Sequence, residues 1–136
     1  MKRYVLDTNL IIRFLTDDHP KMSRAAAALL EESATGKTEL LLEATIVTEA
    51  VFVLTGFYKR PRAEVADALR DLITGCRLRV PNSAVVLDAL ARFKAHPVDF
   101  PDALIAALAV SEGIPVASFN LVFDRFKDLK RSKPDS

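Results

Sequence analysis

Three acidic residues, Asp7, Glu49 and Asp102, lie in widely separated parts of the sequence. The local pattern places each of them at the end of a predicted strand or at the edge of a helix that is expected to be buried. Asp7 interrupts the apolar segment from Tyr4 to Leu15, and a buried carboxylate is costly unless it is paired or bound to a metal. In a parallel sheet the carboxyl ends of the strands gather at one edge, where ligands usually bind. Because Mg²⁺ and Mn²⁺ prefer carboxylate oxygen and water, a hard divalent cation is the ligand that these residues suit.

Asp7 and Glu49 also have structural interpretations, which the sequence leaves open. Asp7 could cap the helix that follows it. Glu49 lies roughly 60° from Ile46 and roughly 40° from Val53 on a helical wheel. It therefore borders the apolar face of its helix, and a surface glutamate is tolerated at such a border.

Asp102 gives the sharpest signal. It comes before eight consecutive apolar residues, Ala103 to Val110. A helix that is apolar on every side is expected to be buried, and its dipole favours a negative charge in the first turn. Asp99 is the natural N-cap of this helix, with Pro101 in the first turn, and capping explains Asp99 better than metal contact does. Asp102 is then left to face the sheet edge.

Further polar residues follow the last predicted strand, at 115–119. Ser118 and Asn120 are delivered to the same edge, although either could instead cap the next helix. Asp124 lies one turn beyond Asn120 on the same helix face, so it either adds a carboxylate or is simply exposed to solvent. The sequence contains no zinc-type spacing of His and Cys, and no serine-hydrolase, P-loop or dinucleotide motif.

Short apolar segments alternate with longer helical patterns, which favours an α/β fold with a parallel sheet between helices. Strands are expected at 3–6, 39–43, 78–80 and 115–119, the first of them buried. Helices are expected at 8–15, 20–36, 45–58, 61–75, 83–96, 102–113 and from about 120 to 129. We expect one domain over residues 1–130 and a disordered tail over 131–136.

Composition and charge indicate the cellular compartment in which the protein is expected. The formal net charge of +1 predicts no partner by itself. The single cysteine, Cys76, cannot form an internal disulfide, which suits a reducing compartment. Asp7, Asn9 and Arg13 break the apolar N-terminal region, so we expect no signal peptide. The longest apolar run, at 103–110, is far below the ~20 residues that cross a membrane, so a cytoplasmic protein without a membrane partner is expected.

Four blocks of the sequence together resemble the PIN-domain ribonucleases, in particular the VapC toxins of bacterial and archaeal toxin–antitoxin pairs. The blocks read LDTNLIIRFLTDD from Leu6, TIVTEAVFVL from Thr45, VDFPDALIAALA from Val98 and VASFN from Val116. They stand in the expected order and span nearly the whole chain. The resemblance implies a PIN-like three-layer α/β/α sandwich with a short-stranded central parallel sheet.

The resemblance also implies roles for the acidic residues. Asp7, Glu49 and Asp102 would bind Mg²⁺ or Mn²⁺, and Asp99 would be an additional carboxylate that supports the site. The last block of the family usually reads Thr-x-Asp, whereas this chain has Ser, Phe and Asn at 118–120. This departure puts the fourth acid in doubt.

The polar residues around these acids take supporting roles under the same resemblance. Asn120 would position a water at the metal, or Asp124 would partly replace the missing charge. Asn9 and Ser118 would form hydrogen bonds around the ligands. Arg13 would reach a substrate phosphate, unless it is an ordinary surface arginine.

The implied activity is that of a metal-dependent endoribonuclease, which hydrolyses RNA and leaves a 5′-phosphate and a 3′-hydroxyl. Toxins of this family usually form homodimers, and a VapB-type antitoxin inhibits them in a heterotetramer or larger complex. The basic residues at 59, 60 and 62 could touch RNA or be solvated. One alternative is a PIN-like binding module that has lost activity. Another is a strand-end-aspartate phosphatase or receiver-type domain, which the Asn at position 9 disfavours.

Overall fold

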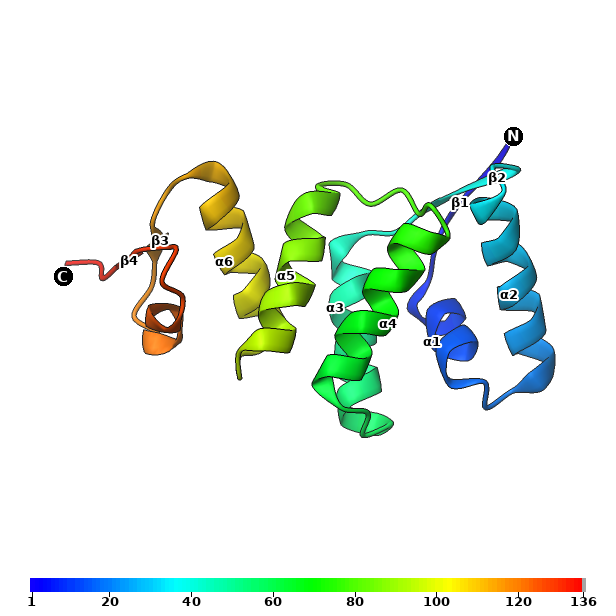
Figure 1. Cartoon of the computed structure of the whole chain (residues 1–136), viewed down its shortest axis with the longest axis horizontal. Coiled ribbons are helices and arrows are strands. Elements are labelled where there is room, and N and C mark those ends of the chain that lie inside the picture. Colours follow the sequence, from blue (N-terminus) through cyan, green and yellow to red (C-terminus); the bar gives the residue numbers. More distant parts are fainter. Residues whose placement is uncertain (136) are drawn as a thin grey trace. The chain divides into compact units, whose positions relative to one another are not determined.

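The computed structural model of the protein describes residues 1–135 (Figure 1). Helices joined to short parallel strands confirm the predicted mixed α/β class. In chain order the elements are β1 (Lys2–Val5), α1 (Thr8–Thr16), α2 (Pro20–Ala34), β2 (Thr38–Leu41), α3 (Ala44–Phe52), the π-helical turn η1 (Val53–Phe57), α4 (Arg62–Gly75), α5 (Ser83–Ala95), α6 (Phe100–Glu112), β3 (Val116–Ala117), the 3₁₀ turn η2 (Leu121–Arg125) and β4 (Arg131–Ser132).

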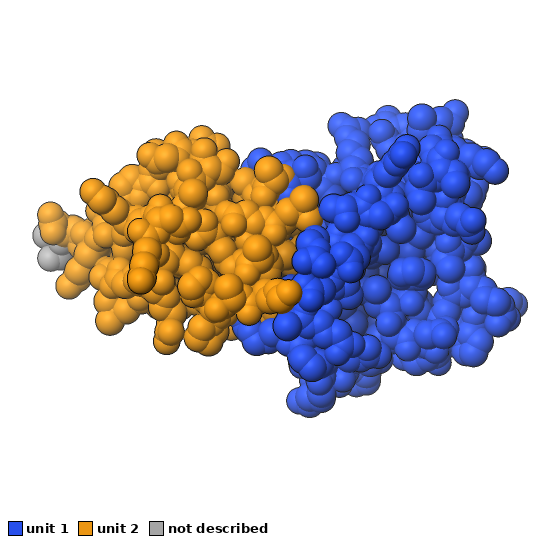
Figure 2. Space-filling model, in the orientation of Figure 1, with its two compact units in different colours: residues 1–83 blue, residues 84–136 orange. Residues whose placement is uncertain are grey.

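The chain divides into two compact units, residues 1–83 and residues 84–136 (Figure 2). The first contains the elements from β1 to α4, and the second runs from α5 to β4. Arg131 and Ser132 form β4 and pair in parallel with β3. The limits of a single domain over 1–130 and of a disordered tail over 131–136 stay predictions.

The first unit is organised around parallel strand pairing. β1 pairs with β2 in a register that matches Lys2 with Thr38 and Val5 with Leu41. In place of the predicted strand at 78–80, the structure has a single parallel bridge from Leu41 to Arg79. Pro81 follows at once, and its missing N–H cannot continue a ladder, which explains why the bridge does not lengthen.

β1 differs from the expectation in its burial. The strand was predicted to be buried, but Tyr4 and Val5 are 45% and 68% exposed, and the prediction was wrong. Among the described residues β1 is hydrogen bonded only to β2, so one of its edges and much of its surface remain uncovered. Burial begins one residue later, at Leu6, which is 2% exposed and donates its N–H to the Leu41 carbonyl at 2.8 Å.

The helices of the first unit bury stripes spaced three and four residues apart, as amphipathic helices do. Ile11 of α1, Leu30 of α2, Val47 of α3 and Leu69 of α4 are each 1% exposed or less. The predicted start of α2 at Pro20 is confirmed, and the His19 side chain accepts the Met22 N–H at 3.2 Å there.

The predicted helix at 45–58 is not a continuous α-helix. It is α-helical through Phe52, and the turn from Val53 to Phe57 is π-helical. The Tyr58 N–H donates to the Val53 carbonyl at 3.1 Å, five residues back. A π turn holds one more residue than an α turn, and such turns are frequent at functional sites.

In the second unit, α6 buries only one of its faces. Ala103, Ala106 and Ala107 are at most 1% exposed, whereas Ile105 and Leu108 are 45% and 44% exposed. The expectation that this helix is buried on every side was therefore wrong. The small alanines allow close packing on one face, and the larger apolar residues lie on the face that the described residues leave open.

The last predicted helix, from about 120 to 129, is also much shorter than expected. Only Leu121–Arg125 is helical, and the backbone of Phe126 is extended at φ −93° and ψ 120°. Phe123 and Phe126 are both 3% exposed, so the 3₁₀ turn and the extended residue after it bury two aromatic rings three residues apart. Within residues 1–135 no helix combines the length and apolar character needed to span a membrane.

Candidate functional site

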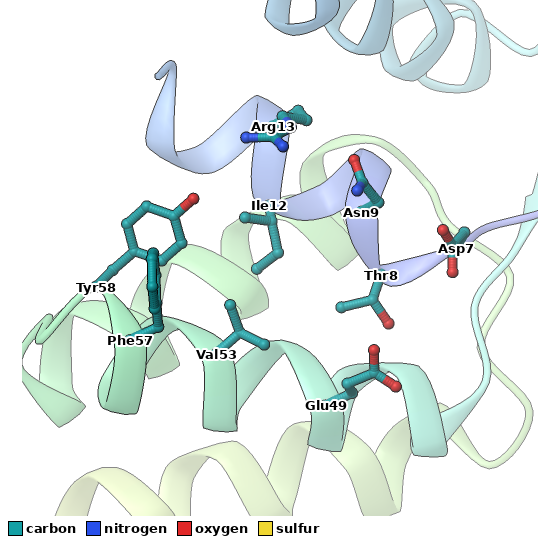
Figure 3. Close-up of a pocket in the computed structure, with 9 residues that line it drawn as sticks. All are labelled: Asp7, Thr8, Asn9, Ile12, Arg13, Glu49, Val53, Phe57 and Tyr58. Atoms are coloured by element: carbon teal, nitrogen blue, oxygen red, sulfur yellow. The ribbon is translucent and has the colours of Figure 1, made fainter. Parts of the chain in front are cut away.

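A pocket of about 400 Å³ opens in the first unit between α1 and the helix formed by α3 and η1 (Figure 3). One end of it carries carboxylates, the middle is aliphatic and the other end is aromatic. The lining residues are Asp7, Thr8, Asn9, Ile12, Arg13, Glu49, Val53, Phe57 and Tyr58.

The pocket brings together Asp7 and Glu49, two acidic residues that are 42 positions apart in the sequence. Asp7 stands at the N-cap position of α1 with an extended backbone, but its side chain forms no capping hydrogen bond. Glu49 projects from α3 toward α1 in Figure 3. Both side chains are exposed, and within residues 1–135 neither forms an ion pair, so both carboxylates are available to a ligand.

Thr8 completes this end of the pocket and lies between Asp7 and Glu49 in Figure 3. Thr8 is only 5% exposed, and its hydroxyl oxygen has no hydrogen-bond partner among the described residues. Leaving a buried hydroxyl unsatisfied costs about 1–3 kcal/mol. A cost of this kind is removed when a ligand or an ordered water supplies the missing partner.

The opposite end of the pocket is held together by Asp18. Its carboxylate accepts hydrogen bonds from the Tyr58 hydroxyl at 2.7 Å, from the Thr16 hydroxyl at 3.0 Å and from the Arg13 guanidinium at 3.0 Å. These partners, Tyr58 foremost, lower the pKa of Asp18 to about 2. Asp18 thereby fixes Tyr58 and Arg13, which both line the pocket.

Asp99 and Asp102 belong to the second unit, at the start of α6. Asp99 occupies the predicted N-cap position with an extended backbone, but its side chain makes no capping hydrogen bond. Asp102 is half-buried in the first turn. Burial raises the pKa of Asp102, and the nearby charge of Asp99 raises it further.

The remaining polar residues of the last block are engaged with their own neighbours. The Asn120 side-chain oxygen accepts the Val122 N–H at 3.0 Å, which makes Asn120 the cap of η2. The Ser118 hydroxyl accepts the Asn120 N–H at 2.9 Å. The Asp124 carboxylate is paired with Arg131 at 3.0 and 3.2 Å, so the charge of Asp124 is already compensated.

The donor atoms of the first-unit pocket fit a hard divalent cation. Two carboxylates from different elements face one space, and the buried Thr8 hydroxyl beside them lacks a partner. Oxygen donors of this kind are those that Mg²⁺ and Mn²⁺ prefer. Over residues 1–135 no group of three or more His, Cys, Asp or Glu is assembled closely enough to hold a metal ion.

Apart from the aliphatic residues of its middle, four residues of this pocket and its surroundings were not identified from the sequence: Thr8, Asp18, Phe57 and Tyr58. Thr8 could have been found, because it stands between Asp7 and Asn9 at the start of a helix. The hydrogen bond between Asp18 and Tyr58 joins residues 40 positions apart, and no local pattern indicates it. Phe57 owes its place to the π turn, which periodicity does not reveal.

Comparison with known proteins places the chain in a family. No curated protein sequence matches it. The family model described as the PIN domain matches residues 4–129, which is most of the chain. The two acidic pocket residues and the α6 acids all lie inside the matched range. The chain belongs to the PIN domain family, a nuclease family whose members are typically metal-dependent.

Proposed function

We propose that this chain is a metal-dependent endoribonuclease and acts as the toxin of a toxin–antitoxin pair. The observation that carries the proposal is the pocket that Asp7 and Glu49 share, with the buried Thr8 hydroxyl between them, which has no hydrogen-bond partner in residues 1–135. Two available carboxylates at one pocket of a PIN domain support the proposal, because such groups can hold the metal ion that a nuclease of this family uses.

Asp7 and Glu49 are the residues that would hold the ion, Mg²⁺ or Mn²⁺, in the first unit. Asp102, with Asp99 beside it, is proposed as the further acidic ligand on the strength of its sequence motif. When bound, the ion neutralises charge on the scissile phosphate, lowers the pKa of a water and stabilises the leaving oxygen. The carboxylates are exposed and unpaired among the described residues, so binding the ion breaks no existing ion pair.

The protein's own side chains bind and orient the RNA. The Thr8 hydroxyl donates a hydrogen bond to a ligand oxygen, and the Asn9 amide lies beside it in the pocket. Arg13 is held by Asp18 and presents positive charge to the phosphate backbone. A water attacks phosphorus in line, the bond to the 3′ oxygen breaks, and the products carry a 5′-phosphate and a 3′-hydroxyl.

The toxin role rests on the four sequence blocks that the chain shares with VapC toxins. We propose a homodimer that works in the cytoplasm and is inhibited by a VapB-type antitoxin in a heterotetramer or larger complex. The exposed apolar side chains of Ile105 and Leu108 on α6 are compatible with protein contacts of this kind.

A PIN-like binding module without activity is the second candidate, and a specific observation favours it. Asn120 stands where the last of the four sequence blocks usually has an acidic residue, and its side-chain oxygen already accepts the Val122 N–H as the cap of η2. Asp124, the other residue that could supply the missing charge, is compensated by Arg131. If three acids do not suffice for cleavage, the chain binds RNA without cutting it.

Cleavage of total cellular RNA by the purified chain separates the two candidates. The assay is run with Mg²⁺, with Mn²⁺ and with EDTA, for the wild type, Asp7→Asn and Asp102→Asn, with Asp71→Asn on the exposed face of α4 as the control. The nuclease proposal expects metal-dependent cleavage by the wild type and the control, and loss in the other two variants. Absence of cleavage by folded, antitoxin-free wild type in either metal contradicts it.

A further inference from the structure

Phe57 is an exposed aromatic residue at the end of the pocket opposite the carboxylates. It is 78% exposed, yet it lines the same pocket as Asp7 and Glu49. In Figure 3, Phe57, Val53 and Glu49 follow one another along the same helix and all project toward α1. Single exposed rings are common on protein surfaces, but this one lies on the wall of the pocket that also contains the two carboxylates.

The π turn is what aligns Phe57 with Glu49. Eight residues along a regular α-helix, Phe57 would lie roughly 80° around the axis from Glu49. Because η1 takes up one extra residue, Phe57 returns to within roughly 20° of the Glu49 direction. The two side chains are thus on one face, separated by about 12 Å of helical rise.

The ring of Phe57 is held in place before any ligand binds. It packs edge to face against Tyr58, with the ring centroids 5.0 Å apart and the planes at 77°. The Tyr58 hydroxyl is in turn bound to Asp18, which also holds Arg13. Phe57 is nevertheless 78% exposed, so most of its side chain remains accessible to a ligand.

Three basic residues are associated with this aromatic end, and two of them are paired with carboxylates. Arg13 lines the pocket and is paired with Asp18 at 3.0 Å, and Lys59 and Arg60 follow Tyr58 directly. Arg60 is paired with Glu64 at 3.0 Å, whereas Lys59 is exposed and forms no ion pair among residues 1–135. An exposed aromatic ring with an unpaired lysine two residues away in the sequence, in the same pocket as a carboxylate site, matches the way proteins bind single-stranded nucleic acid by stacking bases and attracting phosphates.

We propose that Phe57 is a stacking platform for one unpaired base of an RNA strand whose backbone runs along the pocket to the Asp7 and Glu49 end. The base belongs to a nucleotide that flanks the cleaved bond, since the ring lies about 12 Å of helical rise from Glu49. A duplex is excluded from this arrangement, because its bases are stacked on one another. The inference rests on the proposed nuclease function and adds a residue, Phe57, that positions the substrate in this pocket.

The test compares Phe57→Leu, which keeps an apolar side chain but removes the ring, with Phe57→Tyr, which keeps the ring. Phe52→Leu is the matched control, because Phe52 is 53% exposed on the preceding helix and does not line the pocket. Fluorescence anisotropy in EDTA measures binding of a labelled single-stranded RNA of mixed sequence, and of the same RNA annealed to its complement. Thermal unfolding confirms that each variant is folded.

We expect Phe57→Leu to weaken single-strand binding by about fivefold to a hundredfold, the range that loss of one stacked base gives. Phe57→Tyr and Phe52→Leu should stay within about twofold of the wild type, which should prefer the single strand to the duplex. In Mg²⁺, Phe57→Leu should raise KM for cleavage and leave kcat nearly unchanged. Unchanged binding by Phe57→Leu, an equal loss in Phe52→Leu, or no binding of the single strand by the wild type overturns the proposal.

Light scattering on the same samples tests a second copy of the chain as the occupant of this face. A fall in mass on Phe57→Leu with unchanged RNA affinity assigns Phe57 to a protein contact and overturns the stacking role. These measurements distinguish a failure of the stacking proposal from a failure of the nuclease proposal. Cleavage that does not depend on Phe57 removes the platform and leaves the nuclease, whereas Phe57-dependent binding without cleavage removes the nuclease and leaves the platform.

Discussion

The Tyr58 hydroxyl donates a 2.7 Å hydrogen bond to the Asp18 carboxylate and so joins the end of the α3–η1 helix to the end of α1. Both segments carry residues of the candidate site, and this bond closes the pocket between them at the end away from the carboxylates. Asp18 is not among the residues that line the pocket, but it fixes Tyr58 and Arg13, which do line it. The contact therefore couples the stability of this region to the geometry of the pocket.

Asp18 makes the stability of the protein depend on pH in acid. Hydrogen bonds from Tyr58, Thr16 and Arg13 lower the pKa of Asp18 to about 2, below the ordinary value of 3.8. A carboxylate whose pKa is lowered in the folded state stabilises the fold at any pH above its ordinary pKa. This stabilisation is lost as the pH falls from the ordinary pKa toward the lowered pKa of the folded state. Between pH 4 and pH 2, Asp18→Asn should show a shallower loss of stability than the wild type in urea unfolding.

Asp17→Asn is the control for that experiment, because Asp17 is the neighbouring residue and its left-handed backbone, at φ 51°, suits asparagine. Asp17→Asn should retain the steep loss of stability in acid. Equal slopes for the wild type and Asp18→Asn over this range would show that the Asp18 network does not stabilise the folded state.

Replacing Thr8 by valine should separate stability from function. Valine has nearly the same shape and removes a buried hydroxyl that has no partner, so the free energy of unfolding should stay the same or rise by up to about 1 kcal/mol. RNA cleavage should fall by about tenfold or more, because the hydroxyl that contacts the ligand is gone. Denaturant unfolding and initial cleavage rates measure the two effects.

Thr48 of α3 provides the opposite pattern as a control. Its hydroxyl donates to the Ala44 carbonyl at 2.9 Å, and Thr48 does not line the pocket. Thr48→Val should lose about 0.5–1 kcal/mol of stability at most and keep its activity. A Thr8→Val protein as active as the wild type would remove Thr8 from the site.

Replacing Arg92 by lysine should lower the stability of the protein, although the positive charge is kept. The Arg92 side chain is 11% exposed and binds both oxygens of Asp128 at 2.9 and 2.5 Å, and it binds Asp88 at 3.0 Å. Lysine cannot form this forked arrangement. Because Asp128 is half exposed, we expect Arg92→Lys to cost only about 1 kcal/mol in denaturant unfolding.

Arg70→Lys is the matched change at an exposed position. Arg70 is 50% exposed and pairs with Asp67 and Asp71 on α4. Surface ion pairs of this kind contribute little, so its effect should stay within about 0.5 kcal/mol. A loss on Arg92→Lys no larger than that on Arg70→Lys would show that the forked geometry does not matter.

Local patterns predicted the class of fold and the order of its elements well. The starts of α2 and α4 beside Pro20 and Pro61 and the end of α6 at Gly113 follow from backbone chemistry that proline and glycine impose wherever they occur. The predictions were wrong where contacts between distant parts of the chain, and not the local sequence, determine the structure. β1 is exposed because the described residues pair it on one side only, and the last helix ends early because Phe126 turns inward in an extended conformation.

In the candidate site, too, some residues could be predicted from local sequence patterns and others could not. Asp7 could be predicted because it breaks an apolar run, and Glu49 because it borders an apolar helix face, and the structure brings them to one pocket. The aromatic end could not be predicted. It depends on a π turn that shifts Phe57 around the helix and on a bond from Tyr58 to a residue far away in the sequence.

The central claim is that Asp7 and Glu49 hold a divalent metal ion, and titration with Mn²⁺ followed by electron paramagnetic resonance tests it most directly, without requiring the RNA target. The free-ion signal is measured for the wild type, Asp7→Asn, Glu49→Gln and the control Glu43→Gln, whose exposed residue stands at the N-cap position of α3 and does not line the pocket. We predict that the wild type and Glu43→Gln take up Mn²⁺ and that the other two variants bind it at least about tenfold more weakly. Equal uptake by all four proteins would contradict the account.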